Sequence, residues 1–231
     1  MAKNVSLFAV LLGETANPFE PMCLDVLFTG KWEDNFGFSV SMNSAGDRVV
    51  IGGPENDGSG SRAGHARVYA YNGSAWTQLG ADIDGEAADD MSGLSISLSS
   101  DGSRVAIGAY RNDGNGSESG HVRIYQYNNN SWSQLGADIN GEAAVDNSGF
   151  SVSLSSDGSI VAIGAPFNDG NDSKSGHVRV YEYASGAWTQ LGADIDGEAK
   201  IEYSGTSISM NSKGSMVAIG ANYNDGNGIE Y

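Results

Sequence analysis

Three kinds of residue are scarce in this sequence of 231 residues: cysteine, proline and basic side chains. The single cysteine, Cys23, excludes an intrachain disulfide framework, and the four prolines exclude collagen-like and proline-rich disordered chains. Only 12 Lys and Arg accompany 29 Asp and Glu, which leaves a formal net charge of −17. Because a negative field of that size repels phosphate backbones, we expect no nucleic-acid partner.

Long apolar runs and catalytic signatures are also missing. No apolar stretch approaches the ~20 residues that a membrane span needs, so we expect no membrane insertion. The sequence contains no Gly-x-Ser-x-Gly, no His-Glu-x-x-His and no phosphate-binding loop. Enzymes built from repeats usually keep one irregular, non-repeated set of polar residues, and the repeat described next is too uniform to show one. We therefore expect that the protein is not an enzyme.

Glycine and internal repetition are what the sequence has in abundance. The 33 glycines, together with many Ser, Asn and Asp, are typical of tight turns. A period of 56 residues relates successive units without a slip of register. The units are 37–92, 93–148, 149–204 and a partial 205–231, and a non-repeated segment, 1–36, precedes them. The markers of the period are His65, His121 and His177; Trp76, Trp132 and Trp188; Gly37, Gly93, Gly149 and Gly205; and Asp57, Asp113, Asp169 and Asp225.

Each complete unit predicts four short strands. In the second unit, apolar residues and serines alternate over 94–99, which indicates a strand with one buried face. A Ser-Asp-Gly turn at 100–102 leads into a nearly all-apolar strand at 105–109, expected to be buried on both faces. Two further strands follow at 121–127 and near 132–135. Four antiparallel strands per repeat favour an all-β propeller over a solenoid, whose strands pair between repeats and need fewer hairpin turns.

Two short motifs frame the first pair of strands. Phe36-Gly37 opens the first unit and Gly164-Ala165-Pro166 closes a second strand. Between 149 and 164 lie Phe-Ser-Val-Ser-Leu-Ser-Ser-Asp-Gly and Val-Ala-Ile. This pattern resembles the FG-GAP repeat, the blade of the integrin α-subunit propeller and of its microbial relatives. The resemblance covers 37–231, although most copies depart from it, with Ser-Gly in place of Phe-Gly and with Gly-Gly-Pro, Gly-Ala-Tyr or Gly-Ala-Asn in place of Gly-Ala-Pro.

The resemblance implies a non-catalytic propeller that serves in adhesion or extracellular recognition. We accordingly expect an extracellular or cell-surface protein. Some members of the family bind calcium through an Asp-x-Asp-x-Asp-Gly hairpin between the first two strands. Here the equivalent hairpin is the short Ser-Ser-Asp-Gly-Ser at 99–103, with similar turns at 155–159 and 211–215. Because the ligand-rich insert is missing, the resemblance does not carry a calcium site to this hairpin.

A second kind of loop offers clustered oxygen atoms, in the stretch Asn-Asp-Gly-Asn-Gly-Ser at 112–117 and its copies. Calcium prefers six to eight hard oxygen ligands, and this spacing supplies several. Asn, Asp and Gly are also the residues of any tight loop, and we favour that interpretation. The candidate calcium ligands are Asp57, Asp113, Asn115, Asp169, Asn171, Asp225 and Asn227.

Acidic residues recur a second time near the end of each unit. On a strand, Asp82, Asp84 and Glu86 would share one face, which is either solvated or shares a cation. The equivalent sets are Asp138, Asn140, Glu142 and Asp146, and Asp194, Asp196, Glu198 and Glu202.

For the three repeated histidines we expect packing or a local hydrogen bond, since blade symmetry separates them too far for a shared metal. For the three repeated tryptophans we expect packing between blades.

Five Asn-x-Ser/Thr triplets are candidate glycosylation sites in a eukaryotic secreted protein. Such triplets also arise by chance in turns rich in Ser and Asn, so both interpretations stay open. The five residues are Asn4, Asn72, Asn115, Asn129 and Asn171.

The two ends of the chain lead to the functional alternatives. Residues 1–36 are either a short secretory signal or strands at Asn4–Leu12 and Cys23–Thr29, and 205–231 forms only half a unit. The two ends would make about four blades if they shared one, and we slightly favour this closure over pairing between chains or a fragment of a larger propeller. We predict a non-enzymatic binding or adhesion module whose partner is a protein, a glycan or copies of itself. The alternative is a structural subunit of an extracellular filament or surface assembly.

Overall fold

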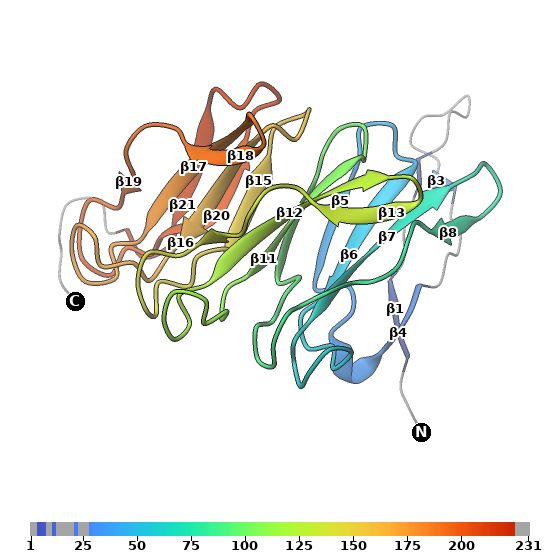
Figure 1. Cartoon of the computed structure of the whole chain (residues 1–231), viewed down its shortest axis with the longest axis horizontal. Coiled ribbons are helices and arrows are strands. Elements are labelled where there is room, and N and C mark those ends of the chain that lie inside the picture. Colours follow the sequence, from blue (N-terminus) through green and yellow to red (C-terminus); the bar gives the residue numbers. More distant parts are fainter. Residues whose placement is uncertain (1–3, 8–10, 13–20, 23–27, 225–231) are drawn as a thin grey trace.

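The computed structural model describes residues 4–7, 11–12, 21–22 and 28–224, and it shows an all-β protein (Figure 1). Three five-stranded sheets and one two-stranded sheet follow one another along the chain and lie side by side. The one helical element in these residues is the 3-10 turn η1 (Trp32–Asp34). No helix in the described ranges is long and apolar enough to cross a membrane.

Each five-stranded sheet contains four antiparallel strands in chain order and a short fifth strand that pairs with the third. The first sheet is β5 (Ser39–Met42), β6 (Arg48–Gly53), β7 (His65–Tyr71), β8 (Trp76–Gln78) and β9 (Ile83–Asp84). The second is β10 (Ser95–Leu98), β11 (Arg104–Ala109), β12 (His121–Asn128), β13 (Ser131–Gln134) and β14 (Ile139–Asn140). The third is β15 (Ser151–Leu154), β16 (Ile160–Ala165), β17 (His177–Ala184), β18 (Ala187–Gln190) and β19 (Ile195–Asp196). The fourth sheet is β20 (Ser204–Met210) and β21 (Val217–Ala221).

The predicted four-stranded pattern is confirmed. The all-apolar strand becomes β11, of which every residue after Arg104 is buried, and Gly102 in the preceding turn has a φ of 68°. The short strands β9, β14 and β19 were not predicted, because two residues are too few to carry an alternating pattern. They matter because each brings the acidic stretch at the end of a unit alongside the strand that begins with histidine.

Apolar cores lie between the sheets. Val50 and Val68 of the first sheet belong to one buried cluster with Leu98 and Ile107 of the second. The next cluster joins the second sheet to the third in the same way. The second sheet thus carries apolar side chains on both of its faces, one packed on the first sheet and the other on the third. The sheets bury their apolar faces by stacking on one another, as the blades of a propeller do.

The innermost strands β5, β10, β15 and β20 are neighbours around this stack and are joined by serine side chains. Ser39 Oγ donates a hydrogen bond to the Gly93 carbonyl oxygen at 2.7 Å, and Ser95 and Ser151 repeat this bond to the following sheet. The Leu98 amide donates in the other direction, to Ser41 Oγ, at 3.0 Å. These bonds explain why alternating serines recur on the polar face of each first strand.

Tryptophan joins the outer parts of the sheets, as the sequence predicted. Trp132 Nε1 donates to the Leu79 carbonyl oxygen at 2.7 Å, and Trp188 makes the same bond to Leu135. Each indole also stacks on a tyrosine of its own hairpin, with the ring centroids of Tyr127 and Trp132 5.0 Å apart. Hydrogen bonding and stacking hold Trp132 and Trp188 between two sheets, which is the packing role expected of them.

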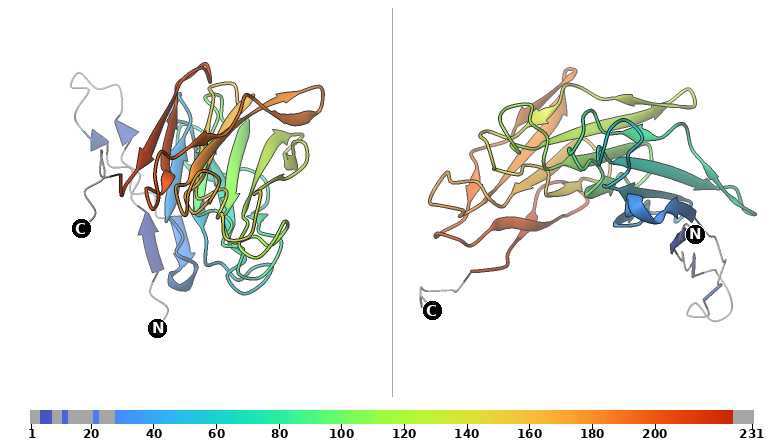
Figure 2. Two further views of the ribbon diagram at one scale, coloured as in Figure 1. Left: turned by 90° about the vertical axis from the view of Figure 1, so that its left-hand side faces the viewer. Right: turned by 90° about the horizontal axis from the view of Figure 1, so that it is seen from below.

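The sheets fan out along an open arc, and within the described residues the two ends do not share a sheet (Figure 2). In the described residues β20 pairs only with β21, and β1 (Asn4–Leu7) pairs only with β4 (Phe28–Lys31). The pair β1–β4 lies beside the first sheet, at the opposite end of the arc from β21 (Figures 1 and 2). Of the two strands expected at 4–12 and 23–29, the structure describes β1, β2 (Leu11–Leu12) and the start of β4, and β3 (Pro21–Met22) falls between them, where a turn was expected. The signal-peptide interpretation concerns residues of which most lie outside the described ranges.

Candidate functional site

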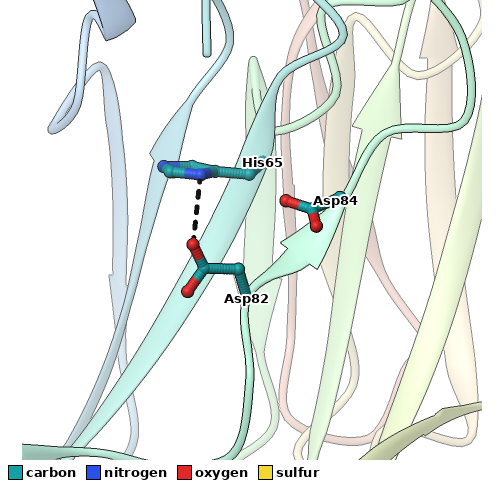
Figure 3. A group of neighbouring side chains, drawn as sticks. All are labelled: His65, Asp82 and Asp84. Carbon is teal, nitrogen blue, oxygen red and sulfur yellow. Dashed lines mark ion pairs between the residues drawn. The ribbon is translucent and has the colours of Figure 1, made fainter. Parts of the chain in front are cut away.

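A buried histidine and two carboxylates meet where β7 and β9 pair (Figure 3). The His65 imidazole lies above the Asp82 carboxylate, with 3.7 Å between Nδ1 and Oδ2, and Asp84 approaches the same ring from the side. One possible ligand atom from each of the three residues lies within 4.8 Å of the other two. The His65 side chain is 1% exposed, so this edge of the ring faces the carboxylates rather than water.

The strand register explains why His65, Asp82 and Asp84 lie close together. His65 lies opposite Asp84 on the antiparallel pair β7–β9, and Asp82 precedes Asp84 by two residues, which places it on the same face. The second and third sheets repeat the pairing, as His121 opposite Asn140 and His177 opposite Asp196. The period of the sequence therefore repeats the cluster three times.

Burial sets the protonation of the histidines. It lowers the pKa of His65, His121 and His177 below the ordinary value, and the arginine two residues further along each strand acts in the same direction. The nearby carboxylates act in the opposite direction without reversing the shift. Each imidazole is therefore neutral at neutral pH, and its Nδ1 atom has no hydrogen-bond partner within the described residues.

The carboxylates are held by arginine and glutamine. Arg67 donates from Nε and Nη2 to Asp82 Oδ2 at 2.9 and 2.8 Å, and Gln78 donates to the other oxygen at 2.7 Å. Burial on its own would raise the pKa of the Asp82 carboxyl, but these hydrogen bonds hold it below its usual value. Asp138 in the second sheet is held by Arg123 and Gln134 in the same manner. Asp82 and Asp138 are therefore ionised at neutral pH.

Sequence reasoning found the members of these clusters but not their meeting. It assigned the histidines to packing and the acidic runs to a solvated or cation-sharing face. Asp82 and Asp84 do share a face, but Glu86 turns to the next sheet, where it joins His121 and Asp138. The constant spacing from each histidine to the residue opposite it, as from His65 to Asp84, was the available signal. It becomes informative only once β9 is known to pair with β7.

The loops proposed as calcium sites use many of their polar groups to close themselves. Asp113 Oδ1 accepts a hydrogen bond from the Glu118 amide at 2.8 Å, and Asp57 and Asp169 repeat this contact. The Asn115 side chain donates to the carbonyl oxygens of residues 141 and 142. Asn171 does the same one unit later. Calcium at these loops stays a prediction, and Asp225 and Asn227 lie outside the described residues.

Four of the five candidate glycosylation sites are exposed in the structure. Asn72 and Asn129 lie in the turns that follow β7 and β12, whereas Asn115 and Asn171 lie in the longer loops just described. Asn72 Oδ1 accepts hydrogen bonds from the backbone of Ser74 and Ala75. For Asn4 the structure describes only the backbone, within β1. Glycan attachment stays a prediction at all five positions.

An aromatic pocket interrupts the symmetry between the third and fourth sheets. Its cavity has a volume of about 260 Å³. Phe167 and Tyr203 meet there edge to face with 5.2 Å between ring centroids, and Tyr223 lies 5.3 Å from Tyr203. One unit earlier, the positions of Phe167 and Tyr203 are occupied by Arg111 and Asn147. The full lining is Phe150, Pro166, Phe167, Tyr203, Thr206, Asn222 and Tyr223.

Comparison with protein families matches residues 81–125 to the FG-GAP repeat. These residues have the pattern of an FG-GAP repeat. The matched stretch runs from just before β9 to the middle of β12, so it contains parts of two successive units, and the 56-residue period continues the same pattern through the other units. The FG-GAP assignment and the stacked antiparallel sheets agree on a β-propeller.

Solved structures with a similar fold include enzymes. A candidate 6-phosphogluconolactonase from Bacteroides uniformis superposes with a TM-score of 0.51 at 11% identity, covering 78% of this chain and 46% of that protein. The periplasmic gluconolactonase PpgL of Pseudomonas aeruginosa gives a TM-score of 0.49 at 14% identity, covering 79% and 50%. This chain thus spans about half the length of these proteins. No curated protein matches it in sequence.

Proposed function

We propose that this protein is a non-enzymatic binding module of the extracellular space and that it binds a glycan in the aromatic pocket. The pocket is the observation that carries the proposal. It is the place where the repeat symmetry is broken, and its lining combines aromatic rings with a hydroxyl and an amide. Aromatic faces and neutral polar groups are the chemistry that binds sugar rings.

The composition of the pocket supports binding rather than catalysis. Its lining contains no carboxylate, histidine, lysine or cysteine. The Thr206 hydroxyl donates to the Tyr203 carbonyl oxygen at 2.6 Å and approaches Asn222 Oδ1, so these groups are positioned before a ligand arrives. The pocket's only titratable side chains among the described residues are those of Tyr203 and Tyr223, and it lacks the carboxylates, histidine and lysine that most often serve as general acids and bases. The likeness to lactonases therefore concerns the fold.

The test is binding to an array of immobilised neutral oligosaccharides. We expect the protein to bind a subset of the array and Tyr223→Ala to lose at least about tenfold in affinity, since base or sugar stacking on one aromatic ring is worth ~1–3 kcal/mol. Tyr223 is 66% exposed, so its removal should leave the fold intact. Phe38→Ala removes an equally exposed aromatic ring outside the pocket and should bind as the wild type does. Equal binding by Tyr223→Ala and wild type, or no binding to any sugar, would contradict the proposal.

A specific observation also favours the second candidate, a subunit of a self-assembling filament or surface coat. On the first sheet Val40 and Met42 are 47% and 42% exposed, whereas the equivalent Val152 and Leu154 of the third sheet are 9% and 8% exposed. In the third sheet the preceding sheet covers these positions. The first sheet therefore presents a row of apolar side chains of the kind that a neighbouring sheet covers elsewhere in the molecule.

The other end of the arc offers complementary hydrogen-bonding groups. Ser207 and Ser209 are exposed on β20, although their equivalents Ser95 and Ser97 bond to the following sheet. If a second copy stacks its β5 on β20 in the register of the repeat, Ser207 Oγ faces the carbonyl oxygen of its Gly37. The amide of its Met42 then faces Ser209 Oγ. A head-to-tail stack of copies would thus continue the bonds that already join the sheets.

A further inference from the structure

The three histidine–carboxylate clusters are not equivalent, and the third is the most complete. Around His177 Nδ1 lie Asp194 Oδ2 at 3.7 Å, Glu142 Oε2 at 3.9 Å and Asp196 Oδ1 at 4.0 Å. Glu142 comes from the second sheet and the others from the third, so the cluster bridges two sheets. The His177 side chain is 1% exposed, and its Nδ1 atom has no hydrogen-bond partner within the described residues.

The oxygens that face His177 are free of the arginine and glutamine contacts. Gln190 donates to Asp194 Oδ1 at 2.6 Å, which leaves Oδ2 toward the imidazole. Arg179 approaches Glu142 Oε1 at 3.4 Å and donates to the Asn140 carbonyl oxygen, which leaves Oε2 toward the imidazole. One oxygen of Asp194 and one of Glu142 are thus held by a neighbouring side chain, and the other oxygen of each faces a buried nitrogen without a hydrogen-bond partner in the described residues. Outer contacts of this type orient the ligands of protein metal sites.

The other two clusters lack this arrangement. In the first, Asp82 Oδ2, the atom nearest His65, accepts both hydrogen bonds from Arg67. In the second, Asp138 Oδ2 accepts from Arg123, and Asn140 stands where the third cluster has Asp196. The first cluster also receives no glutamate from a preceding sheet within the described residues.

We propose that the third cluster is a binding site for a divalent transition-metal ion, with His177, Glu142 and Asp194 as its ligands and with Asp196 beside them. One imidazole nitrogen and two carboxylate oxygens, completed by water, suit Zn²⁺ or Mn²⁺ better than Ca²⁺, which takes oxygen ligands. Zinc bonds of ~2.0–2.2 Å place tetrahedral ligand atoms about 3.4 Å apart. One atom from each of the three ligands lies within 4.8 Å of the other two, and the separations of 3.7 and 3.9 Å from His177 Nδ1 need to shrink by only a few tenths of an ångström.

The negative charge of the third cluster also favours a bound cation. Three carboxylates and the single guanidinium of Arg179 leave a local charge of about −2, which a divalent ion neutralises. Because Glu142 belongs to the second sheet, a bound ion would also link two sheets that otherwise meet through apolar packing and single hydrogen bonds. The ion would therefore stabilise the stack as well as occupy the site.

The test is calorimetric titration of the metal-free full chain with Zn²⁺, supported by the visible absorption spectrum of bound Co²⁺. We expect one tight site per chain, a Co²⁺ spectrum typical of four nitrogen and oxygen ligands, and a melting temperature that rises with Zn²⁺. Asp196→Asn gives the third cluster the composition of the second and should weaken Zn²⁺ binding at least about tenfold. Conversely, Asn140→Asp should raise the stoichiometry above one.

The matched control removes the same charge one unit later. Glu198 is equivalent to Glu142 but is not grouped with a histidine in the described residues. Glu198→Gln should bind Zn²⁺ as the wild type does, whereas Glu142→Gln should not. All four substitutions replace one residue by its near-isostere at exposed or half-buried positions, so folding can be checked by the unliganded melting curve. No saturable Zn²⁺ binding, or equal binding by Asp196→Asn and wild type, would overturn the proposal.

Discussion

At the scale of single residues, the closest contacts between sheets are made by glycine. A Cβ atom built on Gly108 would lie 2.1 Å from the Gly149 carbonyl oxygen of the next sheet, and Gly52 and Gly164 repeat this approach. The backbones of neighbouring sheets meet there with no room for a side chain. This close approach explains why glycine recurs at these positions of the repeat.

We expect Gly108→Ala to reduce the free energy of unfolding by about 3 kcal/mol, because the methyl group clashes with backbone that cannot move away alone. Gly220 is the matched control. It occupies the equivalent position in the fourth sheet, where a new Cβ would meet only the Ser207 hydroxyl, an exposed group that can rotate. Gly220→Ala should change stability by less than about 1 kcal/mol. Denaturant unfolding of both variants measures the difference, and equal losses would contradict this account of the glycines.

At the scale of secondary-structure elements, the polar face of each innermost strand is part of the interface. Ser97 Oγ accepts a hydrogen bond from the Leu154 amide at 3.0 Å, and Ser153 accepts one from Met210. An alternating serine strand would ordinarily indicate a solvent-exposed face. Here the serines supply donors and acceptors to backbone groups of the next sheet, so the strand is held on both faces.

We expect Ser97→Ala to cost about 1–2 kcal/mol of unfolding free energy, since the Leu154 amide would be left without an acceptor. Ser209→Ala serves as the control, because Ser209 is the equivalent residue on β20 and is exposed. It should leave the stability of the isolated chain unchanged. Hydrogen exchange at the Leu154 amide provides a local readout. If Ser97→Ala left both that exchange and the stability unchanged, the hydrogen bond from the Leu154 amide to Ser97 would not contribute to stability.

The element scale also separates what could be predicted from what could not. Long strands such as β11 follow from an apolar run between two turns, and the hairpin at Gly102 follows from its Ser-Asp-Gly sequence. The short β9 and its copies do not, because two-residue strands exist only through their pairing with β7 and its copies. The histidine–carboxylate clusters depend on that pairing, so the residues were visible in the sequence but their meeting was not.

At the scale of the whole molecule, the arc has two unlike ends, and the proposed filament would join them in the register of the repeat. Such an interface is heterologous, so copies joined by it form a ring if the rotation closes and a filament if it does not. The exposed apolar row at one end and the exposed serines at the other are the surfaces on which assembly would depend.

We expect light scattering to show a mass that rises with protein concentration. Val40→Asp should abolish the rise, because it places a charge in the proposed interface, and the exposed face should tolerate it without unfolding. Val145→Asp is the control, since Val145 is 51% exposed on a loop away from either end of the arc. A constant monomeric mass over the whole range, or assembly by Val40→Asp equal to that of wild type, would remove the filament candidate.

The sequence by itself determined the period, the four main strands of each unit, the propeller class and the packing roles of tryptophan, because these depend on local periodicity and turn chemistry. It also identified the acidic stretches and the histidines. The tertiary structure decided the rest: the open arc, the fifth strand, the aromatic pocket and the difference between the three clusters. Each of these depends on which residues of different units become neighbours. Asp84 and Asp196 are the same residue at the same place in the repeat, and only their surroundings in space distinguish them.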